Sequence, residues 1–254
     1  MVLTILKALR ITPRKAYFLI SLILLALIVI AYSKVADAAP PASTSPIVAV
    51  GSSDTFARGT LPRKGPWLGL FCEDGDCELR TIRVSVASSE HENVLGELEE
   101  TEELGVLDNP VAVFHGTPLK AGPVTTWHGV EPSGREFGGT NKMGRWDVPG
   151  RKESFELSWS EQADGEGFRY YLEHGAKKQM LLETAAMTHD GEDVAPIIHW
   201  VGDMDGDGKI DMLVSVAGES CNYDVRLYLS SMAGKGEFVG KAAHFSGDAP
   251  ACGC

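Results

Sequence analysis

Alternating apolar and polar positions mark several short segments of the chain as strands. Ile82, Val84 and Val86 alternate with Arg83 and Ser85, which is the two-residue period of a strand with one buried face. The same period occurs in three later segments, at Phe155, Leu157 and Trp159, at Phe168, Tyr170 and Leu172, and at Tyr223, Val225, Leu227 and Leu229. Shorter apolar runs lie at 111–114, 180–182, 197–201 and 210–216. No segment after residue 38 keeps a helical period, so the pattern predicts an all-β fold, mainly antiparallel sheet or sandwich.

Two stretches do not follow this alternation of apolar and polar residues. Residues 90–103 contain seven glutamates, a composition that indicates a solvated loop or a frayed helix turn, with a docking patch for a basic partner as the alternative. Residues 129–152 contain six glycines and are predicted to form a long loop.

The first 38 residues have the pattern of an export segment. Residues 16–32 carry no charge and follow four basic residues, which orients the N-terminus toward the cytoplasm. As a helix this run reaches about 25 Å, slightly less than a hydrocarbon core. Ala36-Asp37-Ala38 offers small residues where a signal peptidase cleaves. We expect residues 1–38 to be a signal peptide or signal-anchor helix, which makes the rest extracytoplasmic: periplasmic, secreted, or anchored with a cytoplasmic N-terminus.

The remaining chain divides into a linker and one domain. Residues 38–45 are rich in proline, alanine and serine, so residues 39–62 are predicted as a linker and 63–254 as the β-rich domain. The chain has 23 Lys and Arg against 35 Asp and Glu, a net charge of −12. This balance argues against a nucleic-acid partner, and membrane contact is expected only through an uncleaved N-terminal segment.

The five cysteines suit an oxidising compartment. Cys72 and Cys77 flank a short Glu-Asp-Gly-Asp loop and are predicted to pair. Cys221 is expected to bond to either Cys252 or Cys254, which leaves one cysteine over.

One segment carries recognisable chemistry. Residues 203–211 read Asp-x-Asp-x-Asp-Gly-x-x-Asp and lie between two apolar runs. Four carboxylates in so short a loop repel one another unless a cation is bound, and Ca²⁺ accepts irregular oxygen geometry better than Mg²⁺. The predicted ligands are the side chains of Asp203, Asp205, Asp207 and Asp211 and the backbone carbonyl of Lys209. An EF-hand would require glutamate at the twelfth position, where Val214 stands, and the flanking residues are strand-like.

This combination resembles the calcium loops of FG-GAP and VCBS-type repeats, in which an Asp-x-Asp-Gly-Asp-Gly-x-x-Asp-Leu loop joins two strands. The matching run here is 203–212, with Met212 in place of leucine. The resemblance implies Ca²⁺ bound for rigidity. Those families stack many repeats into a propeller, whereas this chain has one good loop. The C-terminal part also looks like a group of uncharacterised exported bacterial proteins.

Common catalytic motifs are absent from the sequence. His199, just before the loop, is a candidate general base but also a typical hydrogen-bonded core histidine; His128, His174 and His189 lie near acidic or aromatic residues. Three hypotheses follow: a non-catalytic, calcium-stabilised exported β module that binds a protein or carbohydrate or has an envelope-structural role, a secreted hydrolase with structural calcium, and an acidic adaptor or inhibitor that docks a basic partner through 90–103.

Overall fold

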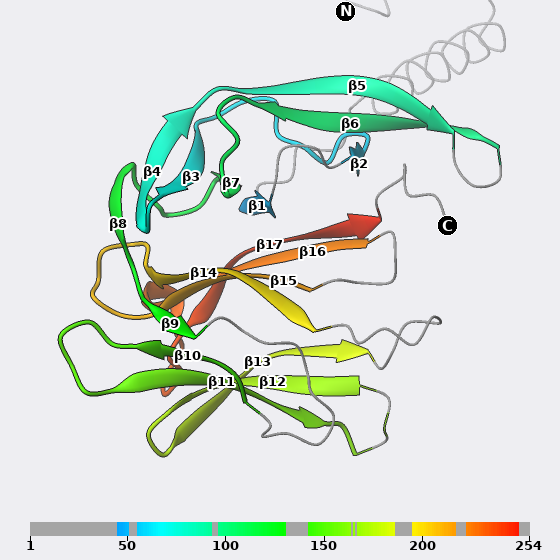
Figure 1. The fold of residues 1–254 in the computed structure, drawn as a ribbon. Coiled ribbons are helices and arrows are strands. Elements are labelled where there is room, and N and C mark those ends of the chain that lie inside the picture. Colours follow the sequence, from blue (N-terminus) through cyan, green and yellow to red (C-terminus); the bar gives the residue numbers. More distant parts are fainter. Residues whose placement is uncertain are drawn as a thin grey trace, which may run out of the picture. The chain divides into compact units, whose positions relative to one another are not determined.

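The structure, a computed structural model, describes residues 45–50, 55–92, 96–130, 142–163, 165, 167–185, 195–216 and 222–248. Contacts divide the chain into two units, Met1–Ala42 and Ser43–Cys254, and every described residue lies in the second. The predicted export segment 1–38 therefore lies outside the described residues. Within the described ranges no helix is long and apolar enough to span a membrane. The predicted all-β, antiparallel character is confirmed (Figure 1).

The largest sheet has nine strands and folds over onto itself. Its order is β1 (Ile47–Val50), β7 (Ala112–His115), β3 (Trp67–Glu73), β4 (Asp76–Ile82), β8 (Gly122–Thr126), β14 (Pro196–Asp203), β15 (Asp211–Val216), β16 (Asn222–Leu229) and β17 (Gly240–Asp248). One core cluster joins its two halves: Leu70 and Phe114 come from the first, Leu213 and Leu227 from the second. Strand β8 connects the halves, because it pairs with both β4 and β14.

A five-stranded sheet covers the other face of β14–β16. Its order is β13 (Lys177–Ala185), β12 (Gly167–His174), β11 (Ser154–Glu161), β10 (Lys142–Asp147) and β9 (Gly129–Val130). Tyr170 and Leu157 of this sheet share a core cluster with Met212 and Val214 of β15. In Figure 1, β14–β17 accordingly lie between two layers. Strand β15 is thus buried on both faces, which explains why its sequence is an apolar run without alternation.

A third sheet, of order β2 (Thr55–Ala57), β6 (Leu98–Val106) and β5 (Val84–Glu92), packs on the first half of the large sheet. Phe56 and Leu104 of this sheet form the third core cluster together with Trp67 and Val113. The only helical element in the described ranges is the short 3₁₀ turn η1 (Ser230–Met232).

The prediction of a loop or frayed helix over 90–103 is wrong, because most of that segment belongs to the β5–β6 hairpin. Two of its glutamates pair with arginines that are distant in the sequence. Glu100 forms an ion pair with Arg58, and the buried Glu102 accepts a hydrogen bond of 2.6 Å from Arg63. These partners lie about 40 residues away, so a local composition count could not reveal them.

Two other segments expected to lack structure also contain strands. The predicted linker 39–62 contains β1 and β2, whose Val48 and Phe56 are buried in two of the cores. The predicted loop 129–152 contains β9 and β10. Each of these strands has six residues or fewer. The proline or glycine residues that flank them therefore favoured a loop prediction over a strand prediction.

A disulfide joins Cys72 to Cys77, as predicted. The two cysteines occupy paired positions on β3 and β4, next to the turn formed by Asp74 and Gly75. Both turn residues have positive φ, 51° and 92°, the backbone geometry that favours Asp-Gly in a two-residue hairpin loop. Cys221, Cys252 and Cys254 lie outside the described residues, so their pairing stays a prediction.

Candidate metal centre

The acidic loop 203–211 connects β14 to β15. Met204 and Ile210, near its two ends, are 3% and 1% exposed and anchor the loop to different cores. Gly206 and Gly208 have φ of 82° and 78°, a conformation that side-chain-bearing residues rarely adopt. Buried anchors and glycine turns thus hold the carboxylates in a fixed arrangement.

Three of the four predicted carboxylates converge. One side-chain oxygen from each of Asp203, Asp205 and Asp211 lies within 4.8 Å of the others. At that separation, two unit charges in a medium of effective dielectric about 20 repel by about 3.5 kcal/mol. Hard oxygen donors in such a group suit a divalent cation, which would remove this repulsion.

Asp211 is the most constrained of the three, because it is fully buried. Its Oδ2 accepts hydrogen bonds from the backbone N–H groups of Met204 and Asp205, at 2.7 and 3.2 Å. Its Oδ1 accepts one from Ser230 N at 2.7 Å. Burial raises the pKa of Asp211 to about 6, although these three bonds oppose the shift. Asp211 therefore both ties the loop together and supplies a partly desolvated charge to it.

The other two converging carboxylates also accept bonds from the loop backbone. The two oxygens of Asp203 accept bonds from Gly206 N at 2.8 Å and Gly208 N at 2.9 Å. Asp205 accepts a bond from Asp207 N at 3.3 Å and another from the Ser231 hydroxyl. Each carboxylate oxygen has two lone pairs, so these bonds fix its direction and leave capacity for a cation.

Asp207 is the predicted ligand that lies apart from this group. Its carboxylate accepts bonds from Lys209 N at 2.9 Å and the Ser230 hydroxyl at 2.8 Å, and pairs with the Lys209 ammonium at 3.0 Å. Coordination by Asp207 and by the Lys209 carbonyl stays a prediction.

Ser230 and Ser231 are site residues that the sequence reading missed. They lie in η1, directly after β16, and reach the loop because β16 pairs with β15. Ser230 bonds to both Asp207 and Asp211, whereas Ser231 bonds to Asp205. Their distance from the loop in the sequence is about 20 residues, and no spacing rule covers such a contact.

The raised pKa of Asp211 predicts a pH dependence in the metal-free chain. The folded state holds this proton more tightly than the unfolded state, so its stabilising contribution is complete below pH 4 and is lost as the pH rises through about 6. We expect a loss of about 3 kcal/mol in the free energy of unfolding from this group. Urea unfolding of the unmodified chain and of Asp211→Ala, in chelator between pH 4 and 7, measures this loss of stability. Parallel pH profiles for the two proteins would contradict the assignment.

The candidate base His199 lies on β14 and contacts Ser215 of β15, with 2.7 Å between Nε2 and Oγ. Burial lowers the pKa of His199, which favours the neutral imidazole. Among the described residues, no carboxylate is bonded to its Nδ1. His174 stacks on Phe155 and His128 is exposed, whereas His189 lies outside the described residues. His199 thus contacts Ser215 on β15, whereas His174, on β12, stacks on Phe155 of β11.

A hollow of about 210 Å³ adjoins the loop. Its walls include Lys209 and Ile210 of the loop and the rings of Trp127, Phe155 and Phe238. Four of the five tryptophans, Trp67, Trp127, Trp146 and Trp200, are at most 5% exposed. They belong to the cores, so they do not form the flat aromatic face that carbohydrate binding would favour.

Comparison of the chain with protein-family models, with curated proteins and with solved structures gives no match.

Proposed function

We propose that the chain is an exported, non-catalytic β module stabilised by one Ca²⁺ ion in the loop 203–211. The observation that carries this proposal is the convergence of Asp203, Asp205 and Asp211 within 4.8 Å between two core strands. Calcium is favoured because the donors are all oxygens in an irregular loop, and extracellular calcium modules work at Kd of about 10⁻⁴ to 10⁻³ M. The loop pattern resembles that of FG-GAP and VCBS-type repeats, which is consistent with this proposal.

Export is supported by the Cys72–Cys77 disulfide, since such bonds persist in oxidising compartments. The apolar segment 16–32 would then direct or anchor the domain outside the cytoplasm. In this proposal calcium makes the β14–β15 end rigid, and the module acts by binding a protein partner or as part of the envelope structure.

A secreted hydrolase with structural calcium is the alternative. The contact between His199 and Ser215 favours it, because a base beside a hydroxyl is the arrangement that activates a serine nucleophile. Covalent labelling of Ser215 by a serine-reactive phosphonate would select this alternative over a binding module.

Unfolding measurements test the calcium proposal. At about 10 mM free Ca²⁺ and the Kd range above, the free energy of unfolding should rise by about 1.4–2.7 kcal/mol relative to chelator. Asp203→Ala should abolish this increase, because it removes one of the converging carboxylates. The matched control is Asp147→Ala, on β10, whose side chain is 71% exposed. Equal stability with calcium and with chelator in the unmodified chain would refute the proposal.

A further inference from the structure

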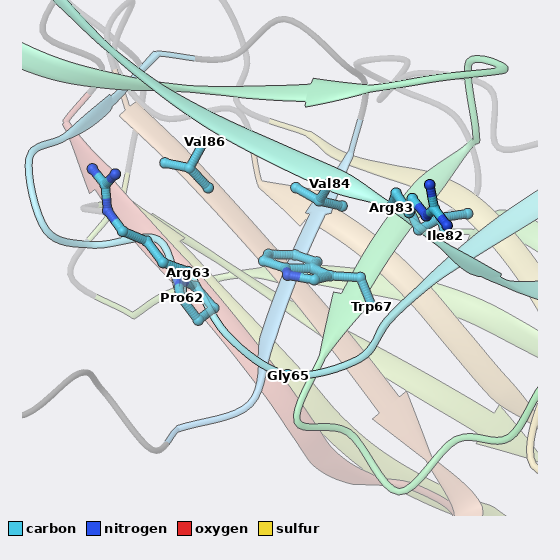
Figure 2. A pocket seen from close by; sticks show the side chains of 8 residues that line it. All are labelled: Pro62, Arg63, Gly65, Trp67, Ile82, Arg83, Val84 and Val86. Carbon is cyan, nitrogen blue, oxygen red and sulfur yellow. The ribbon is translucent and has the colours of Figure 1, made fainter.

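A second hollow, of about 450 Å³, opens beside strand β5 and is larger than the one next to the acidic loop. Figure 2 shows the indole of Trp67 lying close to Val84, with Val86 further along β5. Arg63 lies at one end of this group and Arg83 at the other. Val84 and Val86 also pack against the third core, so the hollow lies at the edge of that core.

Strand β5 is an edge strand. It pairs with β6 without a bulge from Val84 to Glu92, and in the described ranges no strand pairs with its other side. Residues 84–89 contain no charge and no proline. Natural edge strands are usually protected by lysine, proline or a bulge, because their unpaired N–H and C=O groups recruit other chains. An unprotected edge beside a hollow is the arrangement used when a peptide adds to a sheet as an extra strand.

The charges around this hollow indicate which peptide fits. The side chains lining it include Arg63 and Arg83 and no carboxylate, in a chain whose net charge is −12. Arg83 is exposed, and the described structure gives it no ion pair. Arg63 forms an ion pair with the buried Glu102, which balances its charge, and uses Nη2 for Glu102 and Ser88. Its other guanidinium nitrogens can still donate hydrogen bonds to an acidic group. Acidic groups on either side of an apolar one would complement this surface.

We propose that the outer edge of β5 binds an extended segment of a partner protein by strand addition. An aliphatic side chain of that segment fills the hollow over Trp67, and acidic side chains before and after it meet Arg63 and Arg83. This inference rests on the binding role proposed above and not on calcium, because the hollow contains no residue of the loop 203–211.

The test uses a fluorescent seven-residue peptide, Thr-Glu-Thr-Leu-Thr-Glu-Thr. In an extended strand its two glutamates and its leucine lie on one face. The 254-residue chain should bind it, and Arg83→Glu should weaken binding by about tenfold or more, because repulsion replaces a charge-assisted bond. The matched control is Arg151→Glu, an exposed arginine on the loop between β10 and β11, with an expected change below about twofold. N-methylation of alternate peptide amides should abolish binding, and the bound peptide should slow amide hydrogen exchange in residues 84–89.

Affinity should be the same in calcium and in chelator, so failure of the calcium proposal would not obscure this result. Absence of binding at about 1 mM peptide, equal affinity for the Arg83→Glu variant, or tighter binding of a lysine-for-glutamate peptide would overturn the inference. A concentration-dependent dimer that protects residues 84–89 would also overturn it, because the occupant would then be a second copy of the chain.

Discussion

Asp211→Ala should destabilise the folded chain by about 3 kcal/mol or more, even in chelator. The carboxylate of Asp211 is fully buried and accepts bonds from the backbone of Met204, Asp205 and Ser230. Alanine would leave these N–H groups without their acceptor, and two of the three bonds are fully buried. Unsatisfied buried donors each cost about 1–3 kcal/mol, partly recovered by relaxation. Urea unfolding at pH 7 in chelator measures the difference.

Asp205→Ala is the matched control, since it removes another converging carboxylate from the same loop. Asp205 is only partly buried and accepts one long backbone bond, of 3.3 Å, so we expect a cost below about 1 kcal/mol in chelator. In calcium both variants should lose the metal-dependent increase. If Asp211→Ala and Asp205→Ala were equally mild in chelator, Asp211 would not hold the loop as described.

Asp224→Ala should cost about 2 kcal/mol in the free energy of unfolding. Asp224 on β16 accepts two bonds from Arg226, at 2.8 and 2.6 Å, and contacts His244 Nε2 at 3.0 Å. The side chains of Asp224 and Arg226 are 22% and 17% exposed, so the alanine variant leaves a largely buried guanidinium without its carboxylate. Full burial would make the loss about 3–5 kcal/mol, and partial exposure reduces it.

The cost of Asp224→Ala in the free energy of unfolding should depend on pH in one direction. Burial alone would raise the pKa of Asp224, but the bonds and charges of Arg226 and His244 outweigh it and lower the pKa. The stabilisation is therefore present at neutral pH, and the cost of Asp224→Ala should shrink as the pH falls below about 4. Asp147→Ala, which breaks a 3.6 Å exposed pair with Arg145, should cost less than about 0.5 kcal/mol at any pH. A cost for Asp224→Ala as small as that of the control would contradict this account.

The sequence predicted the features that depend on neighbouring residues. Alternation identified β11, β12 and β16, because apolar side chains two residues apart are buried in each strand: Phe155 and Leu157, Tyr170 and Leu172, and Val225 and Leu227. The acidic loop was recognisable because its carboxylates and its glycine turns lie within nine consecutive residues. The short span between Cys72 and Cys77 likewise allowed their pairing to be predicted.

Features that depend on distant residues were missed. The β5–β6 hairpin looked like a solvated loop, because Arg58 and Arg63, which neutralise two of its glutamates, come from the segment between β2 and β3. The role of Ser230 at the acidic loop depends on the pairing of β15 with β16. The hydrogen bond from the Ser230 hydroxyl to Asp207 depends on the same pairing.

Calorimetric titration of the 254-residue chain with Ca²⁺ at pH 7 tests the central claim most directly. We predict one binding event per chain with Kd of about 10⁻⁴ to 10⁻³ M, weaker binding of Mg²⁺, and loss of binding in Asp203→Ala but not in Asp147→Ala. The absence of calcium-dependent heat in the unmodified chain, or an unchanged isotherm in Asp203→Ala, would contradict it.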